Sequence, residues 1–273
     1  MARRATFIND HIDSTDFAMF IDAGGFARGG GDIGKLYTNY LLRGMADLGY
    51  TVFNLSYRDF ITGGNILKDL SNKHNVEFIA SNTFYKDNGK PFTEPYLVKT
   101  IKPHSSGKSL PVDKIRVGIV GMCDEYGLLF SKQIKEPMLE AKPPLDFAEK
   151  LIAQVRKKAD IVVLLYNGNY AKLKPILETV KGIDVTIMGG QYYMVTPNDH
   201  FESIIVSTPS MGKYGGLLTL QLDNKKKIVS HRNENIPLKE DMQDDPAMLK
   251  LIKEFEEAEK KLQDETIYSS SSH

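Results

Sequence analysis

Short apolar runs alternate with segments of helical period along much of the chain. Residues 17–23 and 51–55 are compact apolar runs, which is the pattern of buried strands. Between them, apolar side chains from Ile33 to Leu48 recur at helical spacing, and Gly49 follows where helices commonly end. The same helix-then-strand order is predicted at 66–70 with 78–80, 147–155 with 161–165, and 173–180 with 185–188. This alternation predicts strands joined by crossover helices.

Other strands follow one another with turns and little helix between them. They are predicted at 96–101, 115–121, 204–207, 217–222 and 228–232, and Asp223-Asn224 is a typical hairpin turn between the last two. A charged amphipathic helix is predicted from Pro246 to about 263. The pattern therefore predicts an α/β (α+β) fold, a four-layer α/β/β/α sandwich with mixed sheets. The expected organisation is an N-terminal tail or residual first strand at 1–16, one main domain at 17–240, a C-terminal helix at 241–264, and a disordered tail or tag remnant at 265–273.

Composition excludes several kinds of partner and site but does not identify the ligand. The 273 residues can bury one large core, and 35 Lys and Arg balance 35 Asp and Glu, so no global field favours nucleic acid or an acidic membrane. The single cysteine, Cys123, excludes an internal disulfide framework and a cysteine-rich metal site. No run approaches the roughly 20 apolar residues of a membrane helix, and no signal peptide is recognisable.

Three features are candidate sites on residue chemistry alone. The glycine-rich loop from Gly24 to Gly31, with Arg28, precedes a helix and could present backbone N–H groups to an anion, although a tight crossover explains its glycines equally well. Cys123 and Asp124 follow a predicted strand, where a thiol could react, but neighbouring carboxylates disfavour a thiolate and a buried cysteine is the simpler interpretation. Asp10 and His11 are weak candidates for metal binding near the N-terminus.

Several segments, in order, resemble the metallophosphatase (calcineurin-like) domain of 5'-nucleotidases and 2',3'-cyclic phosphodiesterases. They are FIDAGGF at 20–26, NLSYRDFITGG at 54–64, EFIASNTFYKDNGKPFTEPYLV at 77–98, IRVGIVGM at 115–122, ADIVVLLYNGN at 159–169, GIDVTIMGG at 182–190 and GKYGGLLTLQLD ending at 223. The resemblance covers nearly the whole chain. It implies two divalent metals at the carboxyl ends of the strands, where they would activate a water for attack on phosphate.

The positions that match the family's metal ligands carry other residues here. The bridging aspartate corresponds to Gly25, the ligand asparagine and catalytic histidine to Tyr57 and Arg58, and a strand-end histidine to Asn167. The Gly-His-x-His pair corresponds to Gly190 and Tyr192, or to Gln191 and Tyr193 with one inserted residue. The resemblance thus implies a former metal site, now a ligand site, formed by Gly25, Arg28, Tyr57, Arg58, Asp59, Asn167, Gln191 and Tyr193.

The expected function is a non-catalytic metallophosphatase-like protein that needs no cofactor and binds a small anion or a partner protein at the former active-site rim. The alternative is a metal-dependent phosphoester hydrolase of the 5'-nucleotidase type with a reduced or relocated metal site, using a metal such as Mn or Zn. Family resemblance also implies a periplasmic or extracellular location. The oligomeric state is not encoded in any pattern we recognise.

Overall fold

The computed structural model describes the chain except for residues 105–109, 111, 127–137, 191–200, 210–211 and 271–273. Its first sheet has the order β1-β2-β3 and is parallel throughout, with β1 at Phe20–Asp22, β2 at Tyr50–Asn54 and β3 at Glu77–Ile79. The crossovers are α2 (Gly31–Asp47) and α3 (Gly64–His74), the latter preceded by the 3-10 turn η1 (Asp59–Thr62). The helix-and-strand alternation of the sequence therefore builds this half of the protein.

The second sheet has the order β10-β9-β8-β6-β5 and is mixed. Its parallel strands are β6 (Ile115–Cys123), β8 (Ile161–Asn167), β9 (Val185–Gly189) and β10 (Ile204–Ser207), and β5 (Leu97–Ile101) runs antiparallel to β6 at the edge. The crossover helices are α4 (Leu145–Arg156) and α5 (Tyr170–Thr179). Gly118 lets α4 approach β6 closely, because a Cβ there would lie 2.1 Å from Cγ1 of Val155.

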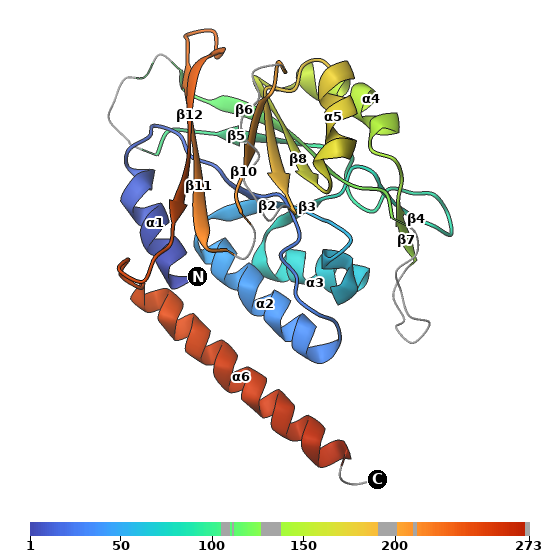
Figure 1. The fold of residues 1–273 in the computed structure, drawn as a ribbon, viewed down its shortest axis with the longest axis vertical. Helices are drawn as coiled ribbons and strands as arrows, with labels where there is room; N and C mark the ends of the chain where they lie inside the picture. Colours follow the sequence, from blue (N-terminus) through green and yellow to red (C-terminus); the bar gives the residue numbers. More distant parts are fainter. Residues whose placement is uncertain (105–109, 111, 127–137, 191–200, 210–211, 271–273) are drawn as a thin grey trace.

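Three apolar layers hold these elements together. One lies between α2, α3 and the first sheet, one between the two sheets, and one between the second sheet and α4 with α5. The order is therefore helices, sheet, sheet, helices, and the predicted α/β/β/α sandwich with a mixed sheet is confirmed (Figure 1). A hairpin, β11 (Tyr214–Leu222) and β12 (Ile228–Pro237), also packs against the layer between the sheets. A short pair joins β4 (Thr83–Tyr85) to β7 (Leu139–Ala141).

The two ends of the chain differ from the sequence expectation. Residues 1–16, expected as a tail or a residual strand, contain the helix α1 (Ala2–Ile12), because Ala2, Ala5 and Ile8 bury one face. The last helix, α6 (Pro246–Ser270), begins at the expected proline but extends past 264. In Figure 1, α6 lies beside α1 and α2 and then runs away from the sheets. Within the described part of the chain, no helix is long and apolar enough to cross a membrane.

Candidate functional site

The carboxyl ends of the parallel strands meet at one edge of the two sheets, which we call the rim. Open α/β sheets place their ligand sites at such an edge because the loops leaving neighbouring strands converge there. Here the rim consists of the loop 23–28 after β1, residues 56–59 after β2, Asp124 after β6, the residues after Asn167 of β8, and Gly190 after β9. The residues singled out by the family resemblance come from these loops.

Asp59 is the buried centre of the rim. Its Oδ2 accepts hydrogen bonds from the backbone N–H of Gly25 at 2.8 Å, from the backbone N–H of Ser56 at 2.7 Å, and from the Ser56 hydroxyl at 2.9 Å. Its Oδ1 accepts the backbone N–H of Ala27 at 2.9 Å. Three of the four donors are backbone N–H groups and the fourth is the Ser56 hydroxyl, so the carboxylate faces the loops after β1 and β2. Asp59 thereby ties the loop after β1 to the loop after β2.

Two asparagine side chains fasten the same loop from the opposite side. Asn167 at the end of β8 donates to the carbonyl oxygens of Ala23 at 3.1 Å and Gly24 at 2.8 Å. Asn54 at the end of β2 donates to the Ala23 carbonyl at 3.2 Å and to the Met122 carbonyl at 2.9 Å. The amide of Asn167 is thus committed to backbone carbonyls, in the position where the family resemblance implies a histidine ligand.

The glycines of this loop are required by its conformation. Gly24 and Gly25 have φ of +89° and +81°, the left-handed region that glycine adopts without strain. A Cβ on Gly24 would lie 2.8 Å from the carbonyl oxygen of Asn54, and one on Gly25 would lie 3.2 Å from Nδ2 of Asn167. An aspartate in place of Gly25, the residue type implied by the resemblance, would therefore need a different backbone.

Asp124 and Cys123 lie where β6 reaches the rim, and both are held by the fold. Asp124 accepts the hydroxyl of Tyr166 at 2.6 Å and the backbone N–H of Asn169 at 2.9 Å. Cys123 is buried, and its carbonyl accepts the side-chain amide of Asn82 at 2.8 Å. Burial raises the pKa of the Cys123 thiol, and nearby carboxylates add to the effect. The thiol is therefore protonated and shielded, which disfavours a nucleophilic role.

Burial dominates the electrostatics of the two carboxyl groups below the loop. Desolvation raises the pKa of Asp22 to about 6, although a hydrogen bond from the Gly24 N–H at 2.8 Å acts in the opposite direction. The pKa of Asp59 is also raised by burial, against the effect of its four donors. Asp59 is fully buried and contacts the backbone and Ser56, whereas Asp22 is partly exposed and accepts the Gly24 N–H.

The structure places three exposed predicted residues in two different surroundings. Tyr57 and Arg58 are exposed on the rim, and the Tyr57 ring lies 6.1 Å from that of Tyr126. Arg28 is exposed and lies over the ring of Tyr37 on α2, at 5.8 Å.

One further pair of predicted residues lies on the N-terminal helix and not at the rim. Asp10 and His11 lie on α1, where Nδ1 of His11 is 2.7 Å from the Phe7 carbonyl oxygen. Gln191, Tyr192 and Tyr193 lie outside the described residues. Of the predicted site, the described rim therefore brings Gly25, Asp59 and Asn167 together, with Tyr57 and Arg58 at its surface.

Sequence reasoning missed the polar residues that build the rim from below. Asp22, Asn54, Ser56 and Asn82 were not singled out as site residues. Asn54 and Asn82 donate to backbone carbonyls of neighbouring rim strands or loops, Asp22 accepts the Gly24 N–H, and Ser56 donates to Asp59. A signal existed for three of them: Asp22, Asn54 and Asn82 are polar residues directly at or after apolar strand runs. A polar side chain in that position needs a buried partner, which the sequence alone does not name.

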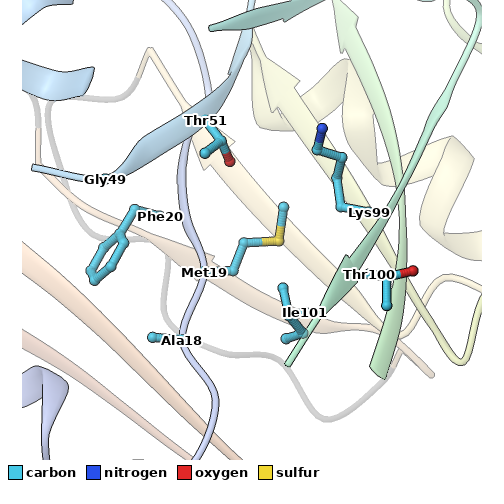
Figure 2. A pocket seen from close by; sticks show the side chains of 8 residues that line it. All are labelled: Ala18, Met19, Phe20, Gly49, Thr51, Lys99, Thr100 and Ile101. Atoms are coloured by element: carbon cyan, nitrogen blue, oxygen red, sulfur yellow. The ribbon is translucent and has the colours of Figure 1, made fainter. Parts of the chain in front are cut away.

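Two hollows of the described part of the chain lie away from the rim. Figure 2 shows one of about 200 Å³ between the first residues of β1 and β2 and the last residues of β5, where Met19, Thr51 and Lys99 are among the lining side chains. Lys99 there pairs with Glu77. A second, of about 430 Å³, lies between α1, α2 and α6. Neither contains a residue that the sequence analysis assigned to the site.

The described rim residues do not fit a pair of metal ions. Among the described residues, no three His, Cys, Asp or Glu side chains come together in a way that could hold one. The matched positions offer a glycine in a left-handed conformation, an asparagine whose amide faces carbonyl oxygens, and the exposed Tyr57 and Arg58. Divalent metals instead take several carboxylate, imidazole or carbonyl ligands within about 2.0–2.6 Å.

Comparisons with known proteins identify relatives of this chain in sequence. No protein-family model matches the chain. In sequence it is 26% identical over 282 residues to a snake venom 5'-nucleotidase of Naja atra, covering 91% of this chain and 49% of that protein. It is 26% identical over 227 residues to the 5'-nucleotidase of Bos taurus, covering 74% of this chain and 37% of that protein. The chain thus spans about half the length or less of these relatives.

Solved structures share the fold over almost the whole chain. The calcineurin-like phosphoesterase YfkN from Bacillus subtilis superposes with a TM-score of 0.77 at 17% identity, covering 95% of this chain and 89% of that one. A 5'-nucleotidase precursor from Thermus thermophilus superposes with a TM-score of 0.71 at 19% identity, covering 94% and 52%. At these identities the structural likeness shows the fold.

Proposed function

This chain is a metallophosphatase-fold relative of the 5'-nucleotidases, and we propose that it is a non-catalytic one, which binds a small anion or a partner protein at the rim. One observation carries the proposal: the polar groups of the rim are engaged in holding the fold. Asp59 accepts four internal donors, and Asn167 donates to two backbone carbonyls. The Oδ2 atom of Asp59, with three donors, has no lone pair left for a metal, and the two hydrogen bonds of Asn167 fix its side chain toward the loop after β1.

The exposed side chains of the rim favour an anion as the ligand. Arg28 and Arg58 bring two cationic groups to its surface, and Tyr57 adds an aromatic ring whose side chain is 42% exposed. A guanidinium presents paired N–H donors that match carboxylate and phosphate geometry. An exposed tyrosine beside it can pack against the remainder of a ligand or against a protein surface. By family resemblance we further propose a periplasmic or extracellular location.

Elemental analysis joined to an activity assay tests the non-catalytic part. The purified protein, dialysed and then supplied with manganese, zinc or cobalt, should retain less than one equivalent of metal. It should hydrolyse nucleotides and a model phosphodiester no faster than its Arg58→Ala variant. Retention of one or two equivalents of metal, together with hydrolysis that is lost in Asp59→Ala or Asn167→Ala, would establish a hydrolase instead.

Calorimetric titration with inorganic phosphate and with small carboxylates tests the binding part. Arg58→Ala should weaken phosphate binding about tenfold, the effect of losing one charge-assisted contact of about 1.5 kcal/mol. Arg232→Ala is the matched control, because Arg232 is exposed on β12, away from the rim, and its loss changes the net charge equally. Equal weakening by both substitutions would show a general charge effect and remove the rim as the site.

The second candidate is a metal-dependent phosphoester hydrolase with a reduced or relocated metal site. The observation in its favour is the relationship itself, since the Naja atra relative aligned over 91% of this chain is a 5'-nucleotidase. Such a site would need ligands beyond Asp59 and Asn167 as they stand, and the carboxyl groups of Asp22 and Asp124 also contact rim loops. The metal-supplemented assay separates the two candidates directly.

A further inference from the structure

The fold gathers cationic side chains at the end of the sandwich opposite the rim. Asp160, whose side chain is only 11% exposed, precedes β8 and pairs with Arg116 of β6 at 2.7 Å and with Lys226 of the β11–β12 turn at 3.1 Å. Three segments far apart in the sequence therefore meet around one carboxylate. The register Ile101↔Ile115 brings the end of β5, and with it Lys102, beside Lys114.

We call this group the basic cluster. It comprises Lys102, Lys114, Arg116, Lys157, Lys158, Lys225, Lys226 and Lys227. The same segments carry three carboxylates, those of Asp113, Asp160 and Asp223, so the cluster has a clear excess of positive charge. The chain as a whole is neutral, and its remainder is therefore net negative. The neutral total charge predicted no electrostatic attraction to acidic partners, but it hides this uneven distribution of charge.

The tip of the cluster is a rigid, projecting turn. Asp223 accepts the backbone N–H groups of Lys225 and Lys227 at 2.8 Å each, which fixes the turn of the β11–β12 hairpin. Figure 1 shows this hairpin extending past the neighbouring strands. Lys225 and Lys227 are exposed, and within the described part of the chain neither pairs with a carboxylate side chain. Beside them, Val229 has 63% of its surface exposed.

We propose that the basic cluster docks the protein onto an anionic phospholipid surface, with the β11–β12 turn in contact. The lysines come from loop ends rather than from the walls of a channel, and neither hollow described above includes a residue of the cluster. Tyr96 is covered by Lys158, whose Nζ bonds its hydroxyl at 2.6 Å. A projecting cationic turn with an exposed aliphatic side chain matches a flat anionic surface. Single-stranded nucleic acid would instead require a groove with exposed aromatic rings for stacking.

Vesicle flotation tests this surface in the intact chain. The protein should float with vesicles of phosphatidylcholine containing about 30% phosphatidylserine at about 0.05 M salt, and should be released at about 0.5 M salt. Neutralising two lysines in Lys225→Gln with Lys227→Gln should weaken partitioning about 25-fold, since each lysine near a membrane surface contributes about fivefold. Lys174→Gln with Lys261→Gln makes the same change in net charge at exposed positions on α5 and α6, and should leave partitioning nearly unchanged.

A fluorescence measurement locates the contact independently. The chain contains no tryptophan, so Val229→Trp introduces a single reporter beside the turn. Its emission should shift to shorter wavelength with phosphatidylserine vesicles and stay unchanged with pure phosphatidylcholine. Any of three results overturns the proposal: equal partitioning to both vesicle types, equal loss in both lysine pairs, or an unshifted reporter. Binding to a single-stranded oligonucleotide without binding to vesicles assigns the cluster to nucleic acid and overturns it as well.

Discussion

Removal of the Asp59 carboxylate should release the loop after β1. In Asp59→Ala, the backbone N–H and the hydroxyl of Ser56 lose their acceptor while they remain buried. The N–H groups of Gly25 and Ala27 also lose it, but these lie nearer the surface and water can replace part of the contact. A buried donor left without an acceptor costs about 1–3 kcal/mol. Two buried and two partly solvated donors together imply a loss of about 3–5 kcal/mol in the free energy of unfolding.

Asp59→Asn should cost less than Asp59→Ala. The amide oxygen can take the place of Oδ2 and keep the bonds from Ser56 and Gly25, whereas the amide NH₂ group would face the N–H of Ala27. The expected loss is about 1–2 kcal/mol, from one broken bond and one donor–donor contact. The ordering wild type, Asn, Ala follows from the geometry of the four donors.

Urea denaturation followed by tyrosine fluorescence and far-ultraviolet circular dichroism measures these losses. The chain has 13 tyrosines and no tryptophan, so tyrosine emission is the available signal. A loss of 3–5 kcal/mol corresponds to a melting temperature lower by about 5–9 °C for a chain of this size. Trypsin cleavage after the exposed Arg28 should also become faster in Asp59→Ala, because that residue lies on the released loop.

Asp69→Ala is the matched control for this prediction. Asp69 is exposed on α3, so the same chemical change should alter stability by no more than about 0.5 kcal/mol. If Asp59→Ala and Asp69→Ala melt together, and cleavage after Arg28 is unchanged, then Asp59 does not hold the loop. The inference that the rim is built for the fold would then fail with it.

Two further substitutions and one labelling experiment probe the same region. Asp22→Asn should remove a pH dependence. Because the folded-state pKa of Asp22 is raised to about 6, its contribution to stability is present at low pH and lost as pH rises from about 4 to above 6. At pH 8 the free energy of unfolding of the variant, measured by urea titration, should exceed that of the wild type by about 1–2 kcal/mol. Asn167→Ala should lower the free energy of unfolding by about 1–2 kcal/mol and also speed trypsin cleavage after Arg28, because two carbonyls lose their donor. Cys123 should resist a disulfide reagent in the native protein and react fully in guanidinium, and rapid native labelling would contradict its burial.

Periodicity predicted the layers well where apolar spacing was regular. The helix expected from Ile33 to Leu48 is α2, and the strand expected at 51–55 is β2, each within about two residues. The turn at Asp223-Asn224 does join β11 to β12. These elements follow their local pattern because one face of each is buried against a neighbouring layer, so packing and propensity agree.

Sequence patterns did not predict the features whose contacts come from distant parts of the chain. α1 was missed because its apolar stripe is weak and Ala2 and Ala5 pack against α6, more than 230 residues later. At the rim, the residue types at 25, 57, 58 and 167 could be compared with a family, but the orientation of Asn167 toward Ala23 and Gly24 could not. Hydrogen bonds between loops depend on the packing of two sheets, which single-sequence patterns do not specify.

The contacts of α1 with α6 and the segment before it can form only late in synthesis. The Thr6 hydroxyl bonds the Gln243 carbonyl at 2.7 Å across 237 positions, and Ala2 and Ala5 share an apolar cluster with Met248 and Leu251. At about 5–20 residues per second, a ribosome makes the second partner roughly 10–50 s after the first. Throughout that interval Ala2 and Ala5 lack their contacts with Met248 and Leu251, so this apolar face of α1 stays partly uncovered until α6 emerges.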